Sequence, residues 1–66
     1  MNRYIHPNAQ LGQNVQVEHF STIYDDVTIG DNCVIHPNVT IFPGTRIGNN
    51  CTIFPGAVIG AIPQDL

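Results

Sequence analysis

A strict six-residue repeat constrains this chain more than any other feature. The first members of the pattern are aliphatic residues, and Ile, Leu or Val occupies all ten sites at positions 5, 11, 17, 23, 29, 35, 41, 47, 53 and 59. Small or β-branched residues stand two places earlier, at Ala9, Val15, Ser21, Val27, Cys33, Val39, Thr45, Cys51 and Ala57. The first and third residues of each unit therefore share one face, which is typical of a short β-strand.

Turn-forming residues follow each aliphatic residue. The third residue of the turn tolerates positive φ in eight of ten units, at Asn8, Asn14, Asp26, Asn32, Asn38, Gly44, Asn50 and Gly56. Four of these follow proline, as Pro7-Asn8, Pro37-Asn38, Pro43-Gly44 and Pro55-Gly56, which predicts type II turns. Phe20 and Ile62 break this rule, so we expect distorted corners at those two positions.

The turns favour a coil over an antiparallel meander, because type II turns splay the strands of a hairpin. A finer period of 18 residues indicates three strands per coil, since a Gly-x-Asn corner recurs at residues 12–14, 30–32 and 48–50. We therefore predict an all-β fold, a parallel β-helix of hexapeptide repeats with a little over three triangular coils. Residues 1–66 form one domain, with a lead-in at 1–4, ten repeats at 5–62 and a departure from the repeat at 63–66.

The composition excludes several classes of partner and location. The chain has 66 residues, no lysine, and only Arg3 and Arg46 as basic residues. It cannot build the basic surface that nucleic acids or acidic membranes require. It also has no apolar run of the roughly 20 residues that span a bilayer, and no secretory signal, so we expect a cytoplasmic protein without membrane insertion.

The ends of a short coil expose backbone groups and apolar side chains, which favours association. We expect a homo-oligomer, either a side-by-side trimer, an end-to-end stack, or both. Aromatic residues at turn positions, Phe20, Tyr24, Phe42 and Phe54, support this expectation. A ligand groove between subunits and simple surface scatter remain the alternatives for these aromatics.

The cysteines and histidines do not form a recognisable reactive site. Cys33 and Cys51 occupy inward positions one coil apart, and we expect reduced core thiols. His6 and His36 each begin a turn, and His19 lies in the corner one coil before that of His36, so the last two can approach each other. Zinc requires three or four ligands that converge. We predict no metal site and no catalytic residue in this chain.

The ten repeats resemble the hexapeptide-repeat transferase family, whose members fold as left-handed parallel β-helices. The left hand is implied by the resemblance alone, since the usual rule for parallel crossovers gives a right hand. The phrases Ile5-His6-Pro7-Asn8-Ala9, Phe54-Pro55-Gly56-Ala57-Val58-Ile59 and Ile59-Gly60-Ala61-Ile62-Pro63-Gln64-Asp65-Leu66 resemble the UDP-N-acetylglucosamine O-acyltransferases of lipid A biosynthesis.

That resemblance implies a reaction and a partial substrate site. Such enzymes move a 3-hydroxyacyl chain from acyl carrier protein to the 3-hydroxyl of UDP-N-acetylglucosamine, and no cofactor is implied. Gln64 and Asp65 correspond to residues that contact the sugar nucleotide. An amide and a carboxylate suit that role, because they form directional hydrogen bonds with hydroxyl and acetamido groups.

The chain also departs from that family. The general base of these enzymes is a histidine on a later coil, and none of His6, His19 and His36 matches it. The residues that measure the acyl chain and the C-terminal helical domain are missing as well. We therefore expect a truncated fragment of the enzyme that is inactive alone. A stand-alone assembly module without catalysis and another hexapeptide-repeat acyltransferase are the alternatives.

Overall fold

The computed structural model describes residues 3–60, which form ten strands of two residues each. One sheet contains, in spatial order, β1 (Tyr4–Ile5), β4 (Thr22–Ile23), β7 (Thr40–Ile41) and β10 (Val58–Ile59). A second contains β2 (Gln10–Leu11), β5 (Thr28–Ile29) and β8 (Arg46–Ile47). The third contains β3 (Gln16–Val17), β6 (Val34–Ile35) and β9 (Thr52–Ile53).

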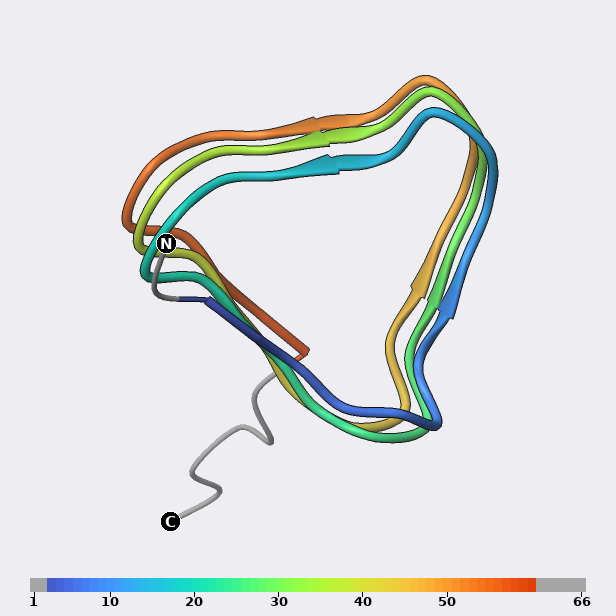
Figure 1. Cartoon of the computed structure of the whole chain (residues 1–66), viewed down its shortest axis with the longest axis horizontal. Helices are drawn as coiled ribbons and strands as arrows, with labels where there is room; N and C mark the ends of the chain where they lie inside the picture. The colour runs from blue at the N-terminus through green and yellow to red at the C-terminus, as the bar shows by residue number, and fades with distance from the viewer. Residues whose placement is uncertain (1–2, 61–66) are drawn as a thin grey trace, which may run out of the picture.

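All strand pairs are parallel, and each strand pairs with the one 18 residues later, as Ile5 does with Ile23. Figure 1 shows the result, about three superposed coils of triangular outline with one sheet on each side. The predicted parallel β-helix is thus confirmed, and residues 3–60 contain no helix. The strands are one residue shorter than predicted. The first residue of a unit still joins the ladder through its carbonyl, since the Tyr4 N–H donates to the Ser21 oxygen at 2.9 Å.

The predicted aliphatic positions form the core. Ile23, Ile29, Ile35 and Ile41 are at most 1% exposed and pack with Val27, Cys33 and Val39. The aliphatic residues of the outer coils are only partly buried, namely Ile5, Leu11, Ile47, Ile53 and Ile59. Among residues 3–60 these outer positions have a neighbouring coil on one side only. The hydrophobic stabilisation is therefore concentrated in the middle of the coil.

Two polar residues are buried in the same core. The Ser21 hydroxyl donates to the His36 carbonyl oxygen at 2.7 Å and accepts from the Val39 N–H at 3.2 Å. The Thr45 hydroxyl donates to the Phe42 carbonyl oxygen at 2.7 Å. Each replaces an aliphatic side chain at the small inward position, and each is satisfied by the backbone of a corner, as buried hydroxyls require.

The corners confirm most of the predicted turns. Positive φ occurs at seven of the eight expected residues, namely Asn14, Asp26, Asn32, Asn38, Gly44, Asn50 and Gly56. Asn8 was wrongly included. Its N–H donates to the His6 Nδ1 at 3.0 Å, and the Ala9 N–H donates to the His6 carbonyl at 2.9 Å, so this turn closes locally without positive φ.

The expected distortion at Phe20 was also wrong. Phe20 adopts φ 61°, the conformation of the Asn and Gly residues at the equivalent corners. Its exposed ring makes an edge contact with the His19 ring at 5.1 Å, and the next coil bonds to this corner through the Asn38 N–H and the His19 oxygen at 3.3 Å. Coil stacking therefore imposes the corner geometry even on a residue that disfavours it.

The corner made of residues 12–14, 30–32 and 48–50, the glycine corner, is closed by side chains of the next coil. The Gln13 N–H donates to Asp31 Oδ1 and the Asp31 N–H donates to Asn49 Oδ1, both at 2.8 Å. A β-carbon at Gly30 would meet Asn49 Oδ1 and would lie 2.8 Å from the backbone of Gly48 and Asn49. A β-carbon at Gly48 would meet nothing within 4 Å. Glycine is thus required where another coil lies on top.

Candidate functional site

The two predicted substrate-binding residues, Gln64 and Asp65, lie outside the described residues. The structure of residues 3–60 therefore bears on the other candidates, which are the histidines, the cysteines and the exposed aromatic residues. Each of these is positioned by a strand end or a corner of the coil.

The three imidazoles contact aromatic rings rather than one another. The His6 ring makes an edge contact with Tyr4 at 6.3 Å, and the His36 ring stacks on Phe54 at 5.9 Å with an interplanar angle of 4°. His19 lies in the same corner as His36, one coil earlier, but its ring contacts Phe20. Within residues 3–60 no imidazole hydrogen-bonds to a hydroxyl, thiol or carboxylate, so no side-chain pair has the geometry of a nucleophile and its base.

The two cysteines are free thiols in one inward column. Cys33 is fully buried, and its Sγ donates to the Gly48 carbonyl at 3.1 Å. Cys51, one coil later, is only partly buried. The part of the chain that the structure describes holds no cluster of three His, Cys, Asp or Glu side chains that could bind a metal ion.

Aromatic residues gather on one side of the coil. Phe20, Thr22 and Tyr24 alternate with the buried Ser21 and Ile23, so they lie on the outer side of the β1-β4-β7-β10 sheet. One coil later the alternation continues, and the Tyr24 and Phe42 rings stack at 5.3 Å and 6°. We define the aromatic face as this surface with its margins, comprising Tyr4, Phe20, Thr22, Tyr24, Thr40, Phe42 and Val58.

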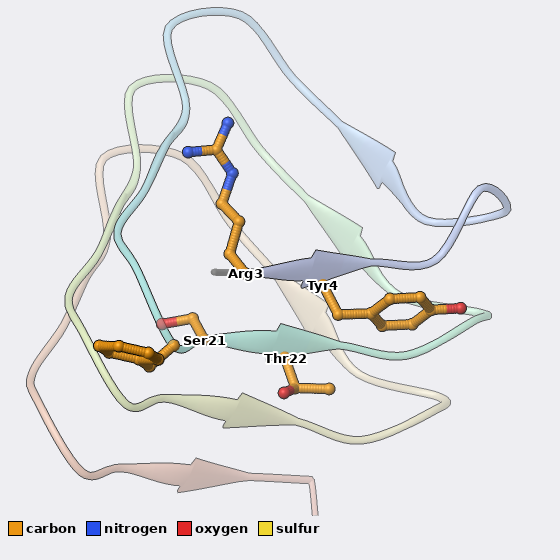
Figure 2. A pocket seen from close by; sticks show the side chains of 5 residues that line it. Arg3, Tyr4, Ser21 and Thr22 are labelled. Carbon is orange, nitrogen blue, oxygen red and sulfur yellow. The ribbon is translucent and has the colours of Figure 1, made fainter. Parts of the chain in front are cut away.

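A shallow hollow opens on the aromatic face. Its volume is about 460 Å³, and it is lined by Arg3, Tyr4, Phe20, Ser21 and Thr22 (Figure 2). The guanidinium of Arg3 donates to the Val17 carbonyl oxygen at 3.2 Å. Sequence reasoning did not find this hollow. The alternation of outward positions 20 and 22, read together with position 4 one coil earlier, was the signal that could have indicated it.

One ion pair was also missed. Arg46 on β8 bonds to Asp26 at a corner of the preceding coil, with Nη2 to Oδ1 at 2.7 Å and Nη1 to the carbonyl oxygen at 2.6 Å. Both side chains are more than half exposed. The pair turns Asp26 toward the β2-β5-β8 sheet and away from the aromatic face.

Comparison with known proteins identifies the repeat. Residues 8–43 match the family described as bacterial transferase hexapeptide (six repeats), and residues 26–61 match the hexapeptide repeat of succinyl-transferase. No curated protein and no solved structure matches the chain. Among residues 3–60 there is no helix that is long and apolar enough to cross a membrane.

Proposed function

Because the chain belongs to the bacterial hexapeptide-repeat transferase family, we propose that it forms the N-terminal β-helix portion of an acyltransferase that acts on UDP-N-acetylglucosamine. The reaction would transfer a 3-hydroxyacyl chain from acyl carrier protein to the 3-hydroxyl of the sugar. The observation that carries this proposal is the unbroken coil through β10, which the segment Ile62-Pro63-Gln64-Asp65-Leu66 follows almost at once in the sequence.

In this proposal Gln64 and Asp65 bind the sugar nucleotide. The carboxylate of Asp65 accepts hydrogen bonds from sugar hydroxyls, and the amide of Gln64 can both donate and accept. The coil serves as a rigid support, which improves the positional precision of a binding site. Residues 3–60 contribute no general base, so this chain alone would be inactive. The proposal also places the chain in the cytoplasm, where nucleotide sugars and acyl carrier protein are found.

Calorimetric titration tests the binding step. UDP-N-acetylglucosamine is titrated into the chain, with UDP-glucose as the matched ligand that lacks the acetamido group. We expect heat of binding with the first ligand, weaker binding with the second, and loss of binding in Gln64→Ala and Asp65→Asn. Asp25→Asn is the control, since Asp25 is an exposed carboxylate at a corner of the coil. Binding that survives both substitutions would exclude this site.

An acyl-transfer assay tests the absence of catalysis. The pure chain is incubated with 3-hydroxyacyl-acyl carrier protein and UDP-N-acetylglucosamine, and acylated sugar nucleotide is measured by mass spectrometry. We expect no product. Turnover above the rate without protein would show that a catalytic group is present in this chain.

The second family match favours one further candidate. Its description names succinyl-transferase, so the module can instead belong to an enzyme that transfers a different acyl group. Titration with succinyl-coenzyme A in place of the nucleotide sugar separates the two candidates. Binding of that donor without binding of UDP-N-acetylglucosamine would support the second candidate over the first.

A further inference from the structure

We propose that the aromatic face is the surface on which a second copy of this chain docks. The proposal does not depend on the acyl-transfer reaction. It begins from an uneven distribution of residue types around the coil. The sequence contains two Tyr, three Phe and three His residues and no Trp. All eight lie on the β1-β4-β7-β10 sheet or at the two corners that border it, and the glycine corner has none.

The exposed apolar side chains follow the same distribution. Tyr4, Phe20 and Val58 are 51%, 57% and 58% exposed, and Tyr24 is 38% exposed. Phe54, at 69%, lies at a bordering corner on the side of the β3-β6-β9 sheet. The outward strand residues of the other two sheets are mostly polar, namely Gln10, Thr28, Arg46, Gln16, Val34 and Thr52. One of the three sides is thus distinctly more apolar than the others.

The area of the aromatic face is sufficient for a small interface. A whole aromatic residue offers about 200 Å², so the exposed parts of the aromatics, Val58 and the two threonines sum to on the order of 500 Å². Two copies would bury about 1,000 Å² in total, which is the lower limit for a specific protein interface. A continuous apolar surface of this size on a small monomer usually has a binding role.

The charges indicate that the occupant is another copy. The outward strand residues of the aromatic face carry no charged group, while the chain as a whole has five acidic and two basic residues. Two copies that meet through this face therefore avoid contact between like charges, which would oppose association. The nearby Asp26 is already paired with Arg46 on the side of the β2-β5-β8 sheet. An uncharged, aromatic surface is the composition expected at the centre of a subunit interface.

The test compares two lysine substitutions in the last described coil. Val58→Lys places a charge on the aromatic face, and Thr52→Lys places the same charge on β9, on another side at the same height. Both parent residues are exposed and β-branched, so both variants should fold. Sedimentation velocity over a concentration series measures association. We expect Val58→Lys to weaken self-association by at least about tenfold and Thr52→Lys by less than about twofold.

Phe20→Asn provides an independent variant. Asn tolerates the positive φ at this corner better than Phe, so the fold should be as stable as the parent or more so, as measured by circular dichroism. Association should nevertheless weaken, because an exposed ring of the aromatic face is lost. A parent chain that stays monomeric up to about 1 mM would overturn the proposal. Equal effects of Val58→Lys and Thr52→Lys would also overturn it, because they would indicate end-to-end contact instead.

Discussion

Replacement of Gly30 and Gly48 by alanine should separate two positions that look identical in the sequence. Both begin the glycine corner in successive coils, and neither has positive φ, so alanine is compatible with the backbone at both. At Gly30 the new β-carbon would lie 2.8 Å from the backbone of Gly48 and Asn49. That is about 0.6 Å closer than ordinary van der Waals contact begins. Backbone atoms cannot rotate away, so the coils must separate locally.

The cost can be estimated from these contacts. Overpacking of this kind costs about 1–3 kcal/mol. The separation also weakens the bond from the Asp31 N–H to Asn49 Oδ1 and that from the Gly30 N–H to the Ile47 oxygen, both 2.8 Å long. Each such bond contributes about 1 kcal/mol. We therefore expect Gly30→Ala to lower the free energy of unfolding by about 2–4 kcal/mol. Gly48→Ala should be neutral or stabilise by up to about 1 kcal/mol, through lower entropy of the unfolded chain.

Thermal unfolding followed by circular dichroism measures the difference. For a domain of this size 1 kcal/mol corresponds to about 4–8 °C, so the two variants should differ in Tm by about 10–25 °C. Urea denaturation provides a second measurement if the thermal transition is broad. Equal stability of the two variants would show that the coils do not stack as closely at this corner as the structure describes, and the explanation of the repeated glycine would be lost.

Three further predictions concern single side chains. Ser21→Ala should cost about 1–3 kcal/mol, because the buried Val39 N–H loses its hydroxyl partner; urea denaturation measures this, and a neutral result would contradict it. Arg46→Ala should cost less than about 1 kcal/mol, since its ion pair is more than half exposed, and a larger loss in the same experiment would show that the pair is not merely a surface contact. A thiol reagent should label Cys51 faster than the fully buried Cys33 in the native chain, with equal rates in urea as the control; equal native rates would refute the assigned burial.

The sequence was sufficient for the topology because the period of the pattern is a direct consequence of the geometry. Each aliphatic residue at six-residue spacing occupies an inward position, and the 18-residue recurrence of the Gly-x-Asn corner gave the correct strand pairing. The hand of the coil did not follow from the residues, because period and alternation are the same in both hands. The corners at Asn8 and Phe20 were wrong for the same physical reason. Local residue preference competes there with bonds to neighbouring groups, which a single repeat unit does not reveal.

The candidate sites were less predictable than the fold. Outward aromatics were recognised, but their gathering on one side depends on combining the alternation within a coil with the stacking between coils, as for Tyr24 and Phe42. The pair of Arg46 and Asp26 joins residues 20 apart, two more than the coil period, so a search at spacing 18 does not find it. The role of Gln64 and Asp65 depends on the family resemblance, and it stays a prediction.

The three-sided cross-section makes the length of the chain a quantised property. Insertion or deletion of 18 residues adds or removes one whole coil, and every column keeps its own kind of side chain. A change of six residues preserves the strands but rotates all later residues by one side, which would divide the aromatic face between two sheets. A change of one residue exchanges inward and outward positions and exposes the core. Homologues and engineered variants of this coil should therefore differ in length by whole coils.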